Sequence, residues 1–239
     1  MADAEMTGQP VAGRSADLFK RAVTAVIMLA VAGAAYHIGR PWWAAFVLVL
    51  SLGVFWEWAQ LVFAFARGPL SRGGWLVVGI AYIAIAAQTL AMGGSDGIAS
   101  SVVLLLVLGV IATDVGAYFA GRSIGGPRIV PSISPNKTWA GLAGGMCASA
   151  AVFGSYAASA MGDQIEPMII GRWVLFGAAL AIVAQIGDFF QSWMKRRAGK
   201  KDSGRLLPGH GGLFDRLDGL MAVAFVAMVI SWATGGYGL

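Results

Sequence analysis

The chain has 239 residues, of which 58% are hydrophobic and only 12% are charged, and its formal net charge is +5. Because this composition lacks the polar faces that a soluble domain needs around its core, it predicts an integral membrane protein. The positive charge does not indicate nucleic acid, since basic and aromatic residues do not alternate along a soluble surface. One cysteine and two histidines far apart in sequence exclude a disulfide framework and a zinc site of Cys and His ligands.

Seven apolar runs are long enough to form membrane-spanning helices, because a helix needs about 20 apolar residues to cross the hydrocarbon core. They lie at roughly 20–38, 42–66, 74–93, 99–120, 139–161, 169–191 and 214–234. The predicted fold class is all-α, a polytopic integral membrane protein with about seven transmembrane helices, in a range of about six to nine. The first run resembles a signal peptide, but the runs that follow favour a retained helix.

The polar ends of the chain and its connecting segments predict its organisation. Residues 1–17 are polar and predict a flexible cytoplasmic tail, whereas residues 18–239 predict a single transmembrane catalytic domain. Of the 17 lysines and arginines, all except Arg40 and Arg172 fall on one side of the predicted membrane. The positive-inside rule therefore places the amino terminus in the cytoplasm. The expected location is the inner membrane of a bacterial cell, with the active site facing the cytoplasm.

Four acidic residues lie inside or at the edge of the apolar runs, where they are costly and are therefore candidates for function. They are Glu57, Asp114, Asp188 and Asp215, and Asp218 follows three residues after the last of them. Asp114 and Asp188 lie near the cytoplasmic ends of their runs. Glu57 fits either a substrate contact or a residue paired between helices.

The sixth run carries a polar stripe that leads out of the membrane. Ser192 and Lys195 follow Asp188 by four and seven residues, so one helix face presents a carboxylate, a hydroxyl and an ammonium in order. Carboxylates rimmed by basic residues suit a divalent cation that carries a phosphate-rich ligand, because magnesium usually takes one or two carboxylates plus phosphate oxygens.

Two polar segments between the runs offer candidate phosphate contacts. The segment 198–213 contains the glycine cluster GHGG, which lets backbone amides approach an anion just before the amino terminus of the last run. The earlier segment, 121–141, contains three prolines and offers Lys137 to a phosphate and Asn136 to a base or sugar. Neither a P-loop nor a G-x-G-x-x-G turn is present, so a nucleotide would be held by another device.

Residues 192–218 have the sequence SWMKRRAGKKDSGRLLPGHGGLFDRLD, which resembles the full signature of the phosphatidate cytidylyltransferases, also called CDP-diacylglycerol synthases. The resemblance extends to the stretches SPNKTWAG and DVGAYFAGRSIG, and so covers about the carboxyl-terminal half of the chain. The chain departs from many relatives at Ala140, where they carry a polar or acidic residue.

This resemblance implies that CTP reacts with phosphatidate to give CDP-diacylglycerol and pyrophosphate, a magnesium-dependent nucleotidyl transfer in phospholipid biosynthesis. The implied metal ligands are Asp188 and Asp215. Whether a second cation, monovalent or divalent, also binds stays open. The implied partners are CTP, phosphatidate and membrane lipids, and a homodimer also stays open. The site is expected at the cytoplasmic interface, built mainly from residues 112–140 and 185–219, with an apolar groove between the sixth and seventh spans.

The candidate site residues come partly from the resemblance and partly from the residues alone. The catalytic candidates are Asp188, Lys195, Asp215 and Asp218. The candidates that the signature implies for substrate binding are Ser192, Lys201, Asp202, His210 and Arg216. The further substrate-binding candidates are Asp114, Asn136, Lys137 and Arg196. The basic residues taken singly also fit positive-inside anchors, and Gly144 and Gly145 predict close helix packing rather than a binding site.

Three other classes of protein share parts of this pattern. A transporter or channel would have acidic residues at mid-membrane and inverted repeats. In this chain the acidic residues gather at one edge of the membrane, and no repeat is evident. An enzyme that exchanges CDP-lipids with alcohols predicts a D-G-x-x-A-R stretch, and both D-G stretches of this chain lack its arginine. A scaffold with a decayed site is disfavoured because the acidic and basic residues are complete.

Overall fold

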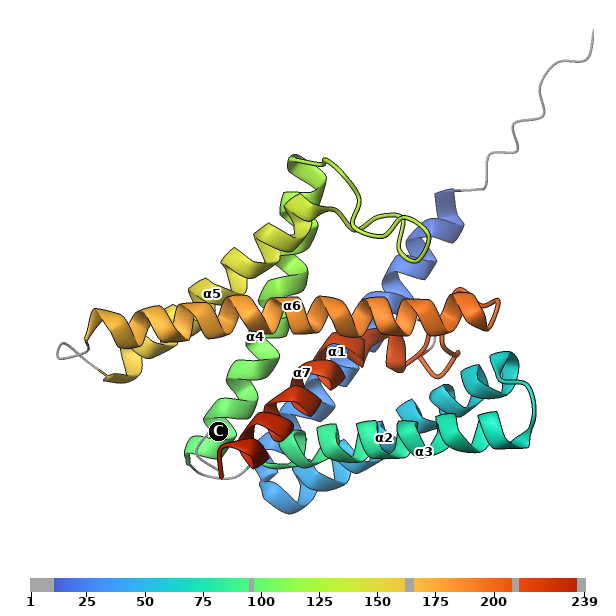
Figure 1. Cartoon of the computed structure of the whole chain (residues 1–239), viewed down its shortest axis with the longest axis horizontal. Coiled ribbons are helices and arrows are strands. Elements are labelled where there is room, and N and C mark those ends of the chain that lie inside the picture. Colours follow the sequence, from blue (N-terminus) through green and yellow to red (C-terminus); the bar gives the residue numbers. More distant parts are fainter. Residues whose placement is uncertain (1–10, 95–96, 162–165, 208–210, 236–239) are drawn as a thin grey trace, which may run out of the picture.

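The computed structural model describes residues 11–94, 97–161, 166–207 and 211–235, and the regular elements of these ranges are all helices. In chain order they are α1 (Val11–Ile38), α2 (Arg40–Phe65), α3 (Pro69–Ala91), α4 (Ile98–Ser123), α5 (Trp139–Met161), α6 (Pro167–Arg197) and α7 (Phe214–Ala233) (Figure 1). The predicted all-α class is confirmed, and each predicted span coincides with one helix.

Length and composition support a polytopic membrane protein. Within the described ranges, five helices are long and apolar enough to cross a membrane, namely α2, α3, α4, α6 and α7. In α1 the apolar stretch is the shorter Val26–Ile38, and α5 is rich in glycine, serine and alanine. The number of helices that cross the bilayer therefore stays a prediction. Helix α1 begins at Val11, inside the segment predicted as a tail, and residues 1–10 lie outside the described ranges.

Local sequence sets where several helices begin and end. Pro41, Pro69 and Pro167 lie in the first turns of α2, α3 and α6, where the missing N–H removes no intrahelical hydrogen bond. Helix α6 continues to Arg197 rather than ending at the predicted residue 191, because basic residues in its last turn suit the negative end of the helix dipole. Gly199 then takes the left-handed conformation, with φ of 65°, that commonly ends a helix.

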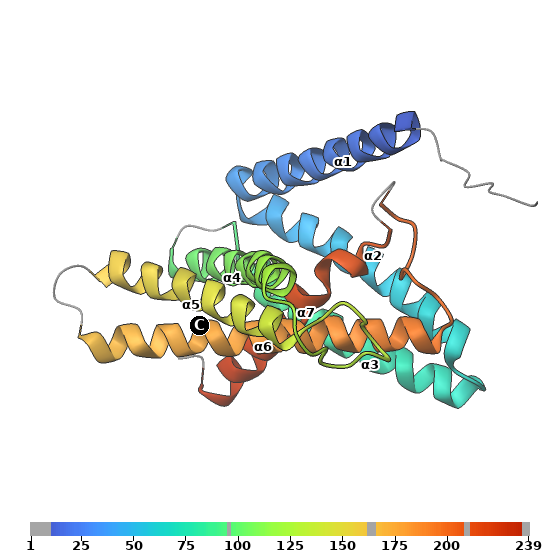
Figure 2. The ribbon, with the colours of Figure 1, turned by 90° about the horizontal axis from the view of Figure 1, so that it is seen from above.

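The helices form two groups that meet along α6 and α7. Helices α4, α5 and α6 pack on one another, whereas α2 and α3 pack on α7, and α1 lies at the edge of the bundle against α2 (Figures 1 and 2). Helices α4 and α5 come closest at Gly116 and Gly144, where an added Cβ on Gly116 would lie 2.5 Å from the Gly144 carbonyl oxygen. A Cβ on Gly145 would lie 2.9 Å from the carbonyl oxygen of Thr113, which confirms the close packing predicted there.

An aromatic cluster joins the two groups beneath the polar connections. Trp58 of α2 is fully buried, and its ring centroid lies 5.8 Å from that of Phe190 on α6 and 5.9 Å from that of Phe214 on α7. Its indole N–H donates a hydrogen bond to the carbonyl oxygen of Trp75 on α3, at 2.9 Å. Burying large aromatic rings with their polar atom satisfied is strongly stabilising, so α2 is held firmly against α6 and α7.

Candidate active site

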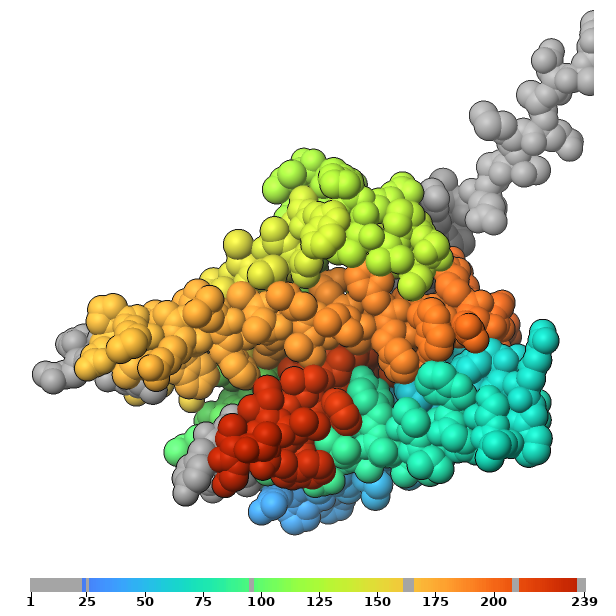
Figure 3. Space-filling view, viewed as in Figure 1, coloured from blue at the N-terminus to red at the C-terminus, as the bar shows by residue number. Residues whose placement is uncertain are grey.

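Two polar connections lie on either side of the carboxyl-terminal half of α6. The first connection, residues 124–138, joins α4 to α5, and Figure 3 shows it lying over that half of the helix. The second connection, residues 198–213, leads from α6 to α7, and its described parts, 198–207 and 211–213, lie between α6 and α2 (Figure 1). Short antiparallel bridges, Arg128 with Thr138 and Leu207 with Gly211, brace the two connections.

A pocket of about 280 Å³ lies between the first connection, α4 and α6, and it gathers four of the predicted site residues. Its lining includes Asp114, Asn136, Lys137 and Asp188. The Lys137 ammonium forms an ion pair with the Asp188 carboxylate, and Asp114 interacts electrostatically with both groups. The structure therefore brings together, around one cavity, two polar segments that are far apart in the sequence.

The carboxyl group of Asp188 meets that of Asp218 where α6 crosses α7. The helices come close because Gly187 has no side chain, and a Cβ there would lie 2.7 Å from the Asp218 carbonyl oxygen. At this crossing the two carboxyl groups are near enough to share a hydrogen bond. Asp218 also accepts a hydrogen bond from the Gly219 N–H at 2.8 Å, and Asp188 accepts a long one from the Ser192 hydroxyl at 3.5 Å.

Asp215, one turn earlier on α7, is surrounded by hydrogen-bond donors. Its Oδ1 accepts from Lys195 Nζ at 2.7 Å and from Gln191 Nε2 at 2.8 Å. Its Oδ2 accepts from the backbone N–H groups of Ser203 at 2.9 Å and Gly212 at 3.0 Å. These four bonds match the roughly four acceptor positions of an ionised carboxylate, so Asp215 joins α6, α7 and both ends of the second connection.

The donor atoms partly fit the implied magnesium. Two carboxyl groups in contact, Asp188 and Asp218, repel each other unless a proton or a cation lies between them, and carboxylate oxygens are the ligands that magnesium prefers. Asp215 has all of its acceptor positions filled by the protein itself. In the described part of the chain, no cluster of three or more His, Cys, Asp or Glu side chains is arranged to hold a metal ion.

Arg196 links the end of α6 to the first connection. Its side chain is exposed, and its Nε donates a hydrogen bond to the carbonyl oxygen of Ile133 in the first connection, at 3.3 Å. The residue predicted to bind substrate therefore also fastens the first connection over α6.

The remaining predicted residues lie on the second connection and at the start of α7. Lys201, Asp202 and Arg216 are exposed. The Asp202 carboxyl group lies beside Gly211, where an added Cβ would be 3.6 Å from it and 3.5 Å from the Asp215 carboxylate. His210 lies outside the described residues.

The glycine cluster acts differently from the expectation that its amides are open to phosphate. The N–H of Gly212 donates to Asp215, and the N–H groups of Leu213 and Phe214 donate to Glu57 at 3.0 and 2.9 Å. These amides therefore serve carboxylates of the protein itself. The N–H groups of residues 212–214 are therefore already bonded to side chains of the protein.

Sequence reasoning missed two residues of the site and left a third undecided. Gln191, which is fully buried, and Ser203 both bond to Asp215. Gln191 follows Asp188 by three residues, so its place on the same helix face was a usable signal; Ser203 carried none. For Glu57, the structure shows the pairing alternative, because its carboxylate is fully buried against the second connection.

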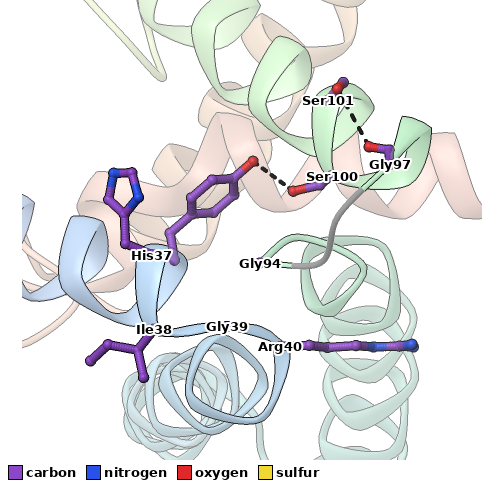
Figure 4. Close-up of a pocket in the computed structure, with 9 residues that line it drawn as sticks. His37, Ile38, Gly39, Arg40, Gly94, Gly97, Ser100 and Ser101 are labelled. Carbon is purple, nitrogen blue, oxygen red and sulfur yellow. Dashed lines mark hydrogen bonds between the residues drawn. The ribbon is translucent and has the colours of Figure 1, made fainter.

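Two other pockets lie away from the carboxylates. The larger, of about 590 Å³, lies at the corner between α1 and α2, where Tyr36 hydrogen-bonds to Ser100 at 2.6 Å and the Arg40 side chain points away from both (Figure 4). Its described lining residues include no carboxylate. The smaller, of about 130 Å³, is an apolar groove between α4, α6 and α7, in the position expected for a groove between the last two spans.

Comparison with known proteins agrees with the class that the structure defines. Apolar helices that gather two carboxylates and a lysine around one pocket define a polytopic membrane protein with an enzyme-like polar site. The sequence profile of the cytidylyltransferase family matches residues 62–233, and the chain belongs to this family.

Curated relatives extend the similarity over nearly the whole chain. A protein of Brucella suis biovar 1 named phosphatidate cytidylyltransferase is 34% identical over an alignment of 252 positions, which covers 87% of this chain and 91% of the relative. A protein of the same name from Pseudomonas aeruginosa is 36% identical over 222 residues, covering 90% of this chain and 77% of the relative. The resemblance inferred from residues 192–218 is confirmed.

Proposed function

We propose that this chain is a phosphatidate cytidylyltransferase, which joins the cytidylyl group of CTP to phosphatidate and releases pyrophosphate. The family and the names of the relatives support the reaction class. The observation that carries the proposal is the ion pair between Lys137 and Asp188, with Asp218 against the same carboxylate. It joins Lys137 of the stretch SPNKTWAG and Asp218 of residues 192–218 to Asp188 on α6, and Asp114 of the stretch DVGAYFAGRSIG lines the same pocket.

The reaction requires the protein to position the two substrates and to neutralise the negative charge of their phosphates. A phosphate oxygen of phosphatidate attacks the α-phosphorus of CTP, a new P–O bond forms, and the bond to the oxygen bridging to the β-phosphorus breaks. Pyrophosphate leaves with the electron pair of that bond. The attacking monoester is largely ionised near neutral pH, since its second pKa is about 6, so no dedicated general base is needed. The barrier is lowered chiefly by alignment and by cations near the transferring group.

The residues of the site fit these two tasks. Lys137 and Lys195 are both largely buried ammonium groups, with side chains 18% and 15% exposed, and each is paired with a carboxylate. We propose that the two lysines contact substrate phosphates, that Asn136 contacts the nucleoside, and that Ser192, Arg196, Lys201, Asp202, His210, Arg216 and Asp114 complete the substrate sites.

For magnesium we propose Asp188 and Asp215, with Asp218 added because its carboxyl group lies against that of Asp188. A bound magnesium ion would supply charge neutralisation at the transferring phosphoryl group. Asp215 can take part only when Lys195 or Gln191 releases its Oδ1. Pairing with the two lysines keeps Asp188 and Asp215 compensated in the ligand-free protein.

The apolar groove between α4, α6 and α7 suits the acyl chains of the lipid substrate. It runs past Val183 on α6 and Val223 on α7, which lie five residues from Asp188 and Asp218, about 7.5 Å along each helix. The groove therefore starts near the carboxyl pair and continues toward Phe176 and Ile230. We propose that the phosphate of phosphatidate lies at the carboxyl pair while its acyl chains follow this groove.

The site is proposed to face the cytoplasm in the inner membrane of a bacterium. The basic residues of both polar connections support this orientation through the positive-inside rule. The relatives named above are bacterial proteins, and CTP is available on the cytoplasmic side.

The test is a transfer assay with the purified full chain in detergent, using labelled CTP, phosphatidate and magnesium. We expect CDP-diacylglycerol and pyrophosphate in equal amounts, and loss of product with a chelator. Asp188→Asn and Asp218→Asn should each lower kcat/KM by at least about 100-fold, the effect of losing one electrostatic contact in a transition state.

The matched control is Glu166→Gln, which makes the same carboxylate-to-amide change at the exposed start of α6, the opposite end of the helix. We expect the activity of this variant to stay within about twofold of wild type, as for a surface substitution. A folded wild-type protein that makes no CDP-diacylglycerol in native lipids would rule out the proposed function.

The groove has a separate test in chain-length dependence. Ala179 is exposed and lines the groove, so Ala179→Trp should fill it without disturbing the core. We expect kcat/KM to fall for long-chain phosphatidate and to change little for a short-chain analogue. Ile182→Trp is the control, because Ile182 is also exposed on α6 but does not line the groove. Equal effects on both lipids would contradict the acyl-chain assignment.

A further inference from the structure

Glu57 stands out because it is a fully buried acid that the proposed chemistry does not use. It lies on α2, more than 140 residues from the partners of its side chain. Its carboxylate accepts hydrogen bonds from the Ser203 hydroxyl at 2.7 Å, the Leu213 N–H at 3.0 Å and the Phe214 N–H at 2.9 Å. All three donors belong to the second connection or to the first residue of α7.

Two glycines of the second connection are explained by this carboxylate. A Cβ on Gly204 would overlap the Glu57 carboxylate, and a Cβ on Gly212 would lie 2.5 Å from its Oε2 and overlap the Ser203 hydroxyl. The connection therefore folds closely around the Glu57 side chain. A buried carboxylate without such donors would cost several kcal/mol, so the connection and Glu57 require each other.

Ser203 connects Glu57 to the active-site residue Asp215. Its hydroxyl donates to Glu57, while its backbone N–H donates to Asp215 at 2.9 Å. Gly212 also connects the two carboxylates, because its N–H donates a hydrogen bond to Asp215 and its Cα lies close to the Glu57 carboxylate. Both carboxylates therefore bond to the same two stretches of chain, one at Ser203 and the other at residues 212–214, and the place of Asp215 relative to Lys195 depends on both.

The backbone that carries Glu57 is itself firmly held. The adjacent Trp58 is fully buried and packs on Phe190 of α6 and Phe214 of α7. Because an interior packed in this way has few alternative arrangements, the Glu57 carboxylate is a fixed point against which the second connection can be placed.

We propose that Glu57 is a positioning residue, whose buried carboxylate holds the second connection and the start of α7 so that Asp215 and Lys195 are aligned for the substrate phosphates. The proposal rests on the proposed function for its effect on CTP, but its structural part does not. All three hydrogen-bond partners of this carboxylate are donors, so a side chain that only accepts hydrogen bonds fits and an amide does not. In Glu57→Gln, the amide nitrogen would face at least one of these donors.

The experiment compares Glu57→Gln with wild type in two measurements on the full chain in detergent. Hydrogen–deuterium exchange without added metal or CTP reports the amides of residues 203–214, and we expect at least about tenfold faster exchange in the variant. Steady-state transfer to phosphatidate reports function, and we expect kcat/KM for CTP to fall at least about tenfold.

Two further variants keep the test sharp. Thr89→Val is the matched control, because Thr89 is also fully buried and its hydroxyl joins α3 to the Ala224 carbonyl oxygen of α7 at 2.7 Å, away from the second connection. It should leave exchange of residues 203–214 unchanged. Ser203→Ala removes one of the three bonds to Glu57 and keeps the backbone N–H on Asp215, so it provides a milder change if Glu57→Gln fails to fold.

The outcomes separate the two proposals. Exchange of residues 203–214 at the wild-type rate in Glu57→Gln, or in Ser203→Ala when the first variant does not fold, would overturn the positioning role. So would faster exchange with unchanged kcat/KM for CTP, or an equal effect of Thr89→Val. An inactive wild type would instead overturn the proposed function, because the exchange measurement needs no turnover and still decides whether Glu57 holds the connection.

Discussion

Replacing Asp215 with asparagine changes one oxygen to an NH2 group of nearly the same shape and leaves the four donors around it in place. Whichever way the amide turns, its nitrogen faces two donors. These are either the N–H groups of Ser203 and Gly212 or the side chains of Gln191 and Lys195. In the first orientation two hydrogen bonds are lost. In the second, Gln191 can turn its amide so that its Oε1, which has no partner in the wild type, accepts from the new NH2 group, and the Lys195 ammonium still loses its acceptor.

Each donor left without a partner costs about 1–3 kcal/mol, so with at least one such donor the free energy of unfolding should fall by at least about 1–3 kcal/mol. At about 2–4 °C for each kcal/mol in a chain of this size, the lower bound of about 1 kcal/mol corresponds to a fall of about 2 °C in Tm. Thermal unfolding in detergent, followed by tryptophan fluorescence, measures this shift directly, since the chain has nine tryptophans.

The matched variant is Asp202→Asn, which makes the same change at an exposed aspartate of the second connection. Its free energy of unfolding should change by less than about 0.5 kcal/mol, as for most surface substitutions. If Asp215→Asn unfolds within about 1 °C of wild type, the four-donor arrangement does not stabilise the protein and the reasoning is wrong.

Three further predictions concern the loop, the pocket and the topology. Gly212→Ala should lower Tm by several degrees and abolish transfer, because its Cβ would press against the Glu57 carboxylate; both are measured on the purified variant. Lys137→Met should lower kcat/KM for CTP by about 100-fold or more, since it removes a cation from the phosphate site. After replacement of the single cysteine, Lys201→Cys should react with an impermeant maleimide only from the cytoplasmic side, and Glu166→Cys only from the opposite side.

Each of these predictions has a result that would contradict it. Gly73→Ala is the control for the glycine, because a Cβ there meets nothing within 4 Å, and an equal loss in this variant would refute the steric argument. Lys200→Met is the control for charge, and an equal fall in kcat/KM would show that general positive charge matters rather than the pocket. Labelling of both cysteines from the same side would refute the proposed topology.

The helices were predictable because a membrane-spanning helix has a local sequence pattern, about 20 consecutive apolar residues. The differences lie at the ends of helices: α1 begins at Val11 rather than at residue 20, and α6 continues to Arg197, in both cases through polar stretches that hydropathy does not recognise as helix. The stripe predicted on this helix was correct in placing Asp188, Ser192 and Lys195 along it, because helical spacing needs no knowledge of the partner elements. Gln191 belongs to the same site and follows from the same spacing.

The pairing of the charged groups was not predictable from sequence. Asp188 engages Lys137 of the first connection and Asp218 of α7, whereas Asp215 engages Lys195. Each acid could have met several lysines of similar spacing in sequence. The approach of Asp218 to Asp188 depends on how closely α6 and α7 cross, for which the missing side chain of Gly187 leaves room. The pairing of Asp188 with Lys137 depends on where the first connection lies.

The sequence by itself therefore determined the membrane class, the helices, the family and the chemical types gathered in the second connection, since these depend on local composition and on a nearly continuous stretch of residues. Tertiary structure decided which carboxylate meets which cation, and it decided the role of Glu57. A buried acid in an apolar helix is costly wherever it lies, so the sequence marks Glu57 as unusual. Only the packing of α2 beneath the second connection shows the three donors that compensate it.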